Sequence, residues 1–207
     1  MIPPTSTTRS SSFRQGFRVW ATRRHGHTPR SEGDDYACTV PDYQPMASRL
    51  STERLRLRPW MESDVDELRA LVTEQGDGVP TVENIRERIT TQLAATAQTG
   101  IALFPICRRV EGDFIGYCGL IVGRSSVDEP EIAYELFRRV HGRGYATEAA
   151  RAVLEAAITT GRTRLWSTVG SWNTPSFRVL EKLGFKRDHV TTNDDGSEIV
   201  WLTRVLP

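Results

Sequence analysis

A turn with two glycines, set between a strand-like and a helix-like segment, constrains this chain more than any other feature. The run EIAYELF (131–137) is typical of a strand, and TEAARAVLEAAITTG (147–161) repeats apolar residues at helical spacing. Gly142 and Gly144 lie between them, on either side of Arg143. Glycine permits positive φ, and the first N–H groups of a helix lack partners within the helix. The pattern therefore predicts a phosphate site at the helix start, with a plain strand-to-helix turn as the alternative.

Two common phosphate-binding folds do not match the sequence around this turn. A P-loop requires GxxxxGK[ST], which the chain lacks. A dinucleotide-binding fold requires GxGxxG, but Thr147 stands at the third glycine position. That fold also needs an acidic residue after the next strand, and GSWNTPS follows RLWSTV (164–169) instead.

The remaining patterns predict a single α/β domain without internal repeats. Ser63 is the expected N-cap of the first helix, Thr81 with Asn84 begins the second, and Gly100 ends it. The turn Glu111–Asp113 is expected to join two strands as a hairpin. Strands are expected over 54–60, 101–110, 113–123, 131–137, 164–169 and 197–206, and helices over 62–72, 81–100, 147–161 and 174–184.

The first 45 residues differ from the rest of the chain. They are rich in Ser, Thr and Arg and contain no acidic residue before Glu32. Such a composition predicts a disordered extension at 1–45 and a folded domain at 46–207. A transit peptide, a true start at Met46, and a nucleic-acid-binding tail are the alternatives.

Charge and composition exclude several classes of protein. The net charge of +1 argues against nucleic acid as a partner of the domain. A membrane is not an expected partner, because no apolar run approaches the roughly 20 residues that span a bilayer. Without a secretory apolar segment, a cytoplasmic location is expected. The three cysteines lack CxxC spacing and the four histidines are scattered, so no metal site is expected.

Two segments together resemble the acetyl-coenzyme A signature of the GNAT N-acetyltransferase superfamily: HGRGYATEAARAVLEAA and WNTPSFRVLEKLGF. TERLRLRP (52–59) resembles the opening of the RimJ/RimL-like branch, and the resemblance covers residues 50–206. It implies the GNAT fold, an α/β architecture whose mixed, mostly antiparallel central sheet is splayed at its middle strands and flanked by helices. The family motif Q/R-x-x-G-x-G/A falls on His141, Gly144 and Ala146, with His141 where Gln or Arg is usual, or, shifted by two residues, it matches from Arg139.

The resemblance also implies a donor site for acetyl-CoA as co-substrate. The N–H groups of residues 143–146 would hold the pyrophosphate, and pantetheine would enter between the strands 131–137 and 164–169. Asn173 matches the family asparagine that bonds the pantetheine arm. The residues expected at the donor site are Leu136, Phe137, Arg138, His141, Gly142, Arg143, Gly144, Tyr145, Ala146, Thr147 and Asn173.

Acetyl transfer to an amine needs a base for the ammonium proton and help for the departing thiolate. Strand alternation places Glu131 and Glu135 on one face, so Glu131 is the expected base and Glu135 the alternative; either could be a solvated or paired charge. The family tyrosine that serves as acid is replaced by Leu180. Ser176 of NTPS, which matches the RimJ/RimL-like branch, is expected at the thiol, with a local helix cap as the alternative.

The expected function is direct transfer of acetyl from acetyl-CoA to a primary amine, on a protein N-terminus or a small molecule. The acceptor is expected to meet the segments 73–84 and 122–130. A non-catalytic acyl-CoA-binding sensor or interaction module with the same fold is the alternative. Whether the chain forms a homodimer stays open.

Overall fold

The computed structural model describes residues 43–76 and 78–207, so most of the extension expected at 1–45 lies outside the described residues. The order of elements is the expected one with two added strands. The strands are β1 (Leu50–Ser51), β2 (Leu55–Leu57), β3 (Leu103–Arg108), β4 (Phe114–Ile121), β5 (Glu131–Leu136), β6 (Arg164–Gly170), β7 (Lys186–Thr192) and β8 (Glu198–Val205). The helices are α1 (Val65–Glu74), α2 (Val82–Thr99), α3 (Tyr145–Ile158) and α4 (Thr174–Lys182), with short 3-10 turns η2 (Glu62–Asp64) and η3 (Arg138–Val140).

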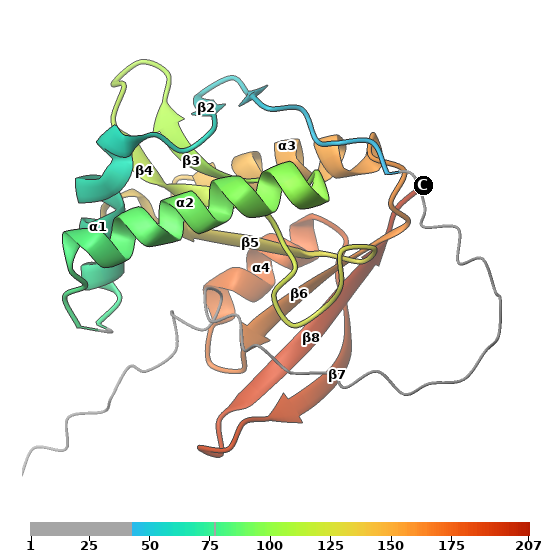
Figure 1. Cartoon of the computed structure of the whole chain (residues 1–207). Helices are drawn as coiled ribbons and strands as arrows, with labels where there is room; N and C mark the ends of the chain where they lie inside the picture. The colour runs from blue at the N-terminus through green and yellow to red at the C-terminus, as the bar shows by residue number, and fades with distance from the viewer. Residues whose placement is uncertain (1–42, 77) are drawn as a thin grey trace, which may run out of the picture.

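All eight strands form one sheet in the order β1-β2-β3-β4-β5-β6-β8-β7 (Figure 1). Every neighbouring pair is antiparallel except β5 and β6, which are parallel and share one registered pair, Glu131 with Trp166. The backbone N–H of Trp166 donates to Pro130 O at 2.9 Å beside this pair. The ladder between the two middle strands therefore covers only the first residue of β5, which confirms the expected splay.

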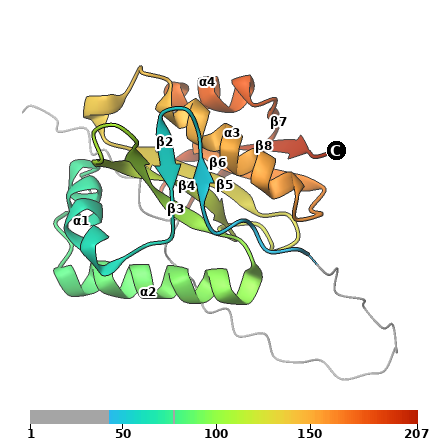
Figure 2. The same cartoon turned by 90° about the horizontal axis from the view of Figure 1, so that it is seen from above.

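Helices cover both faces of the sheet, and Figure 2 shows α1 and α2 on one side with α3 and α4 on the other. The faces expected to be buried are buried, because each packs its apolar stripe against the strands. These buried residues are Val65, Leu68 and Leu71 of α1, and Ala149, Ala150, Val153, Leu154 and Ala157 of α3. Among the described helices, none combines the length and apolar character that crossing a bilayer requires.

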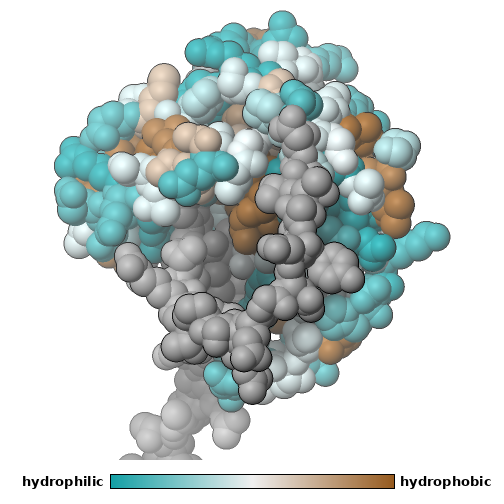
Figure 3. Space-filling model, turned by 45° about the vertical axis from the view of Figure 1, so that its right-hand side comes forward, coloured by the Kyte–Doolittle hydropathy of each residue, from teal (hydrophilic) through white to brown (hydrophobic). Residues whose placement is uncertain are grey.

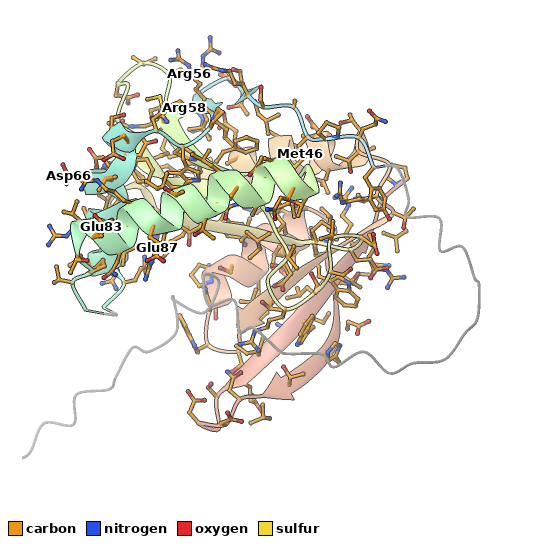
Figure 4. The ribbon with its side chains drawn as sticks, viewed as in Figure 1. Met46, Arg56, Arg58, Asp66, Glu83 and Glu87 are labelled. Carbon is orange, nitrogen blue, oxygen red and sulfur yellow. The ribbon has the colours of Figure 1, made fainter. Side chains whose placement is uncertain are left out.

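The outer surfaces of the helices are charged. Asp66, Glu83 and Glu87 are exposed on α1 and α2, and Figure 4 shows them toward the same end of this helix pair. On the face drawn in Figure 3, hydrophilic residues predominate and hydrophobic residues form small separate patches. Apolar surface is thus mostly withdrawn into the core between sheet and helices.

Two strands, β1 and β7, and one cap differ from the sequence expectation. The strand β7 was not predicted because its residues KRDHVTT are polar, and it forms an edge that pairs only with β8. The expected cap at Ser63 is wrong, because Ser63 lies inside η2. Asp64 stands at the N-cap position of α1 without a side-chain cap bond, and its carboxylate accepts instead from Met61 N, before η2, at 2.8 Å. The expected Thr81–Asn84 capping box and the Gly100 C-cap of α2 are confirmed.

Candidate functional site

The glycine turn leads from β5 through η3 into α3. Gly142 and Gly144 have φ of +74° and +81°, a region that side chains with a Cβ rarely enter. Because Gly144 is the N-cap, α3 begins at Tyr145, two residues earlier than the run from Thr147 predicts. The first helical hydrogen bond is donated by Glu148 N to Gly144 O at 3.0 Å. The N–H groups of Tyr145, Ala146 and Thr147 therefore have no acceptor within the helix and remain for a ligand.

The two candidates for the leading residue of the motif are engaged with the fold instead. The Nε2 atom of His141 lies 2.9 Å from Leu136 O. Arg139 pairs with Asp113 at 3.2 Å and donates to Phe114 O at 2.9 Å. Both side chains thus brace the turn against the β3–β4 hairpin and the end of β5.

The backbone just before the turn is also engaged. Phe137 N donates to Ile115 O at 3.0 Å, and Arg138 N donates to a carboxylate oxygen of Glu74 at 2.7 Å. Glu74 ends α1, so this bond holds the α1–α2 corner, part of the expected acceptor segment 73–84, against the start of the turn. Among the expected donor residues with side chains, Arg138, His141 and Arg143 are exposed, and Arg143 lies between the two glycines of the turn.

Across the gap between β5 and β6, Tyr134 reaches the start of α4. Its hydroxyl donates to Ser176 O at 3.1 Å, and burial raises the pKa of Tyr134. The Oδ1 atom of Asn173 accepts from Ser176 N at 3.3 Å, so Asn173 and not Ser176 caps α4. The amide nitrogen of Asn173 and the half-buried Ser176 lie together at this helix start. Leu180, at the position of the family tyrosine, is fully buried in the core.

Glu131 sits where the two middle strands meet. Glu131 is 3% exposed, and its carboxylate accepts from Thr168 Oγ1 at 2.6 Å and from Arg124 N. A Cβ on Gly123, whose φ is +55°, would collide with this carboxylate, so glycine there makes room for it. Burial raises the pKa of Glu131, although the bonds from Thr168 and Arg124 partly oppose the shift.

Glu135 lies on the same face as Glu131, two pleats along β5. It is half-buried, and its Oε2 atom accepts from the hydroxyl of Tyr117 at 2.6 Å. Tyr117 is its direct partner on β4. The structure thus brings both candidate bases to one face, with Glu131 enclosed and Glu135 more open.

An aromatic cluster that the sequence analysis did not anticipate lies beside Glu131. Trp166 and Trp201 are 5.8 Å apart edge to face, and His189 stacks on Trp201 at 5.1 Å. Thr168 pairs with Trp201 in the β6–β8 ladder, so the cluster shares the face of the Glu131 carboxylate. Among the described helices, none covers this half of the sheet on that side (Figure 1). The three residues come from three strands, and only their register could have revealed the cluster.

Cysteine and metal chemistry find no support in the described part of the chain. Cys118 is fully buried, and burial raises the pKa of its thiol. Cys38 lies outside the described residues. Within residues 43–76 and 78–207, no group of three or more His, Cys, Asp or Glu side chains is placed to hold a metal ion.

Comparison with known proteins matches this architecture to one family. Residues 54–186 match the model of the acetyltransferase (GNAT) domain. The uncharacterized protein YkkB of Bacillus subtilis (strain 168) is 29% identical over 145 residues, which cover 66% of this chain and 84% of YkkB. The uncharacterized N-acetyltransferase p20 of Bacillus licheniformis is 29% identical over 147 residues, covering 67% of this chain and 83% of p20.

Solved structures show the same fold. An acetyltransferase from Agrobacterium tumefaciens str. C58 is 26% identical, with a TM-score of 0.63, and the match covers 75% of this chain and 93% of that one. RimL, a ribosomal L7/L12 alpha-N-protein acetyltransferase solved with coenzyme A, is 17% identical with a TM-score of 0.67, over 76% of this chain and 98% of RimL. With the glycine turn, the splayed strands and the matched domain in agreement, this chain belongs to the GNAT acetyltransferase family.

Proposed function

We propose that this protein transfers the acetyl group of acetyl-CoA directly to a primary amine bound in the same complex. One observation carries the proposal: the parallel strands β5 and β6 share a single pair and open toward the glycine turn. Pantetheine in that gap can pair with exposed backbone as an added strand would. The pyrophosphate then reaches the free N–H groups at the start of α3.

The residues at the gap supply what amine acetylation needs. The amine nitrogen attacks the thioester carbon, the C–S bond breaks, and the amine proton must leave while the thiolate gains one. Glu131, with a raised pKa in its enclosed site, is the proposed base, and Glu135 is the alternative. Ser176 at the start of α4 is the proposed donor to the departing thiolate, and Asn173 offers its amide nitrogen to the pantetheine arm.

We infer an acceptor that approaches from the face of Glu131, between the α1–α2 corner and the β4–β5 connection. The opening TERLRLRP and the fold shared with RimL support placement in the RimJ/RimL-like branch. A protein N-terminus is therefore one acceptor class, and a small-molecule amine is the other. A screen of amines and N-terminal peptides with labelled acetyl-CoA identifies the acceptor.

Donor binding is tested with a matched pair of glycine variants. Gly144 and Gly161 both have φ of +81°, and they lie at opposite ends of α3. Gly144→Asp places a carboxylate beside the pyrophosphate, so acetyl-CoA affinity should fall roughly tenfold or more. Gly161→Asp carries the same charge and backbone strain and should keep the affinity of wild type. Equal thermal stabilisation of Gly144→Asp and wild type by acetyl-CoA would place the phosphate elsewhere.

Catalysis is tested separately from binding. Release of free coenzyme A thiol in the presence of an amine panel shows transfer. Stabilisation by acetyl-CoA without thiol release for any amine or peptide would instead favour the non-catalytic sensor with the same fold.

A further inference from the structure

Thr52 and Arg54, which come far earlier in the sequence, bind the first turn of α3 through Glu148. Thr52 Oγ1 donates to Glu148 Oε1 at 2.5 Å, and Arg54 N donates to the same oxygen at 3.0 Å. Arg54 Nε donates to Glu148 Oε2 at 2.7 Å. We call Thr52, Arg54 and Glu148 the latch. Both oxygens of a helix carboxylate are thus held by a segment about 94 residues away in sequence.

Arg54 also holds the turn that precedes the helix. Its Nη1 atom donates to Arg143 O at 3.1 Å, and its guanidinium lies 4.6 Å from the ring centroid of Tyr145. Arg143 and Tyr145 flank Gly144, the N-cap of α3. In a trans peptide the C=O and the N–H point in opposite directions. By holding Arg143 O, Arg54 directs the N–H of Gly144 away from itself, to the side left for phosphate.

The latch also pairs the Glu148 carboxylate, whose charge would otherwise be unfavourable at this helix start. A carboxylate in the first turn of α3 would repel a bound phosphate and compete for the partial positive charge there. Burial alone would raise the pKa of Glu148, but the bonds from Thr52 and Arg54 outweigh it and hold the pKa below its usual range. The carboxylate therefore stays ionised and paired with Arg54 at 2.5 Å, which leaves the helix N-terminus free to attract the donor.

The latch lies at the surface and not in the core. The Arg54 side chain is 44% exposed, and all three residues line an open groove of about 770 Å³ together with Gly144 and Thr147. Removing the Arg54 side chain therefore opens no core cavity. A change in donor use can be separated from a loss of folding.

We propose that Arg54, through Glu148 and Arg143 O, is a positioning residue that sets the orientation of the phosphate turn. The proposal rests on the proposed function, because it assumes that the turn holds the pyrophosphate of acetyl-CoA. Arg54 acts through the turn and needs no contact with the reacting atoms. Its effect should be confined to donors that carry the pyrophosphate.

The experiment compares two donors, acetyl-CoA and S-acetylpantetheine, which lacks the pyrophosphate and the nucleotide. Arg54→Ala should lower kcat/KM for acetyl-CoA roughly tenfold through KM, with kcat nearly unchanged. With S-acetylpantetheine, variant and wild type should agree within about twofold. Arg56→Ala is the matched control, since Arg56, labelled in Figure 4, is an exposed arginine two residues from Arg54 and is not part of the latch.

Arg54→Lys separates positioning from charge. Lysine keeps the charge, but a single ammonium cannot span the Glu148 carboxylate and Arg143 O as the planar guanidinium does. A loss of about threefold or more with acetyl-CoA should therefore remain. Full recovery by lysine, or equal losses with both donors, would overturn the positioning role. If wild type releases thiol from neither donor, the proposed function itself fails. If wild type is active and Arg54→Ala lowers kcat/KM equally for both donors, only the positioning role of Arg54 fails.

Discussion

At the residue scale, the enclosure of Glu131 links activity to pH. Its carboxylate must lose its proton to act as a base, and burial raises its pKa toward the range where a base is most effective. Glu131→Gln should lower kcat/KM by about 10²-fold at pH values above the pKa of Glu131 and below that of the amine, where Glu131 is ionised and the amine is mostly protonated. Part of the loss should return at high pH, where solvent supplies neutral amine. A pH–rate profile of the variant against wild type gives the measurement.

Glu135→Gln is the matched control for the base. It removes the same charge from the same face of β5, where Glu135 accepts from Tyr117. A wild-type profile for Glu131→Gln together with a lost acidic limb for Glu135→Gln would move the base to Glu135. If both variants keep the wild-type profile, neither glutamate is the base.

The same carboxylate predicts a gain in stability when it is replaced. Because the folded-state pKa of Glu131 is raised, the folded protein holds this proton more tightly than the unfolded chain. The resulting stabilisation is present below the unfolded pKa and is lost as pH rises through the folded pKa. Glu131→Gln should thus unfold at a higher temperature than wild type at neutral pH, and the difference should shrink toward acid pH. A constant difference across that range would contradict the raised pKa.

The loss of activity on replacing Ser176 should not depend on pH. Departure of the thiolate does not depend on the protonation of the acceptor, so Ser176→Ala should lower kcat by up to about 10²-fold at every pH. Ser171→Ala, at an exposed serine before α4, is the control and should keep the kcat of wild type. A loss for Ser176→Ala that disappears at high pH would place the hydroxyl on the acceptor side.

At the element scale, the junction between β2 and α1 depends on one partly buried ion pair. Arg58 donates to both oxygens of Asp64 at 2.6 and 2.7 Å, and the side chain of Asp64 is 4% exposed. Asp64→Ala leaves the partly buried Arg58 guanidinium without its carboxylate and should cost about 2 kcal/mol. Asp66→Ala, at an exposed carboxylate of the same helix, should stay within about 0.5 kcal/mol. Urea unfolding of both variants measures the contrast, and similar midpoints would show that the pair contributes little.

Elements were predictable from the sequence where their cause is local. Gly144, Thr81 and the apolar stripe of α3 each act within a few residues, so the turn, the cap and the buried face follow from short patterns. β7 escaped prediction because an edge strand needs no apolar alternation. The contacts of Arg54 with Glu148 and of Trp201 with Trp166 depend on the packing of distant segments and on strand register. No short pattern encodes those.

At the scale of the whole molecule, residues before Met46 contact the folded domain, so a domain that starts at Met46 would lack these contacts. Gln44 N donates to Thr160 O at 3.1 Å. The guanidinium carbon of Arg162 lies 4.4 Å from the ring centroid of Tyr43. We expect a chain that starts at Tyr43 to keep kcat/KM within about tenfold of the full chain. A chain that starts at Met46 should have a lower Tm, because Arg162 is buried and loses this cover. Equal Tm values would show that these contacts are dispensable, and a larger fall in activity for the Tyr43 start would place residues 1–42 at the site.

The backbone ladder between β5 and β6 has one registered pair, Glu131 with Trp166, so the two halves of the sheet are joined mainly at the start of β5. If acetyl-CoA fills the gap as proposed, it bridges β5 and β6, so the donor stabilises the fold in addition to supplying the acetyl group. A ligand at 100 times its Kd stabilises a fold by about 2.7 kcal/mol. The stability of this protein would then follow the concentration of acetyl-CoA, and the fold would be least stable where the donor is scarce.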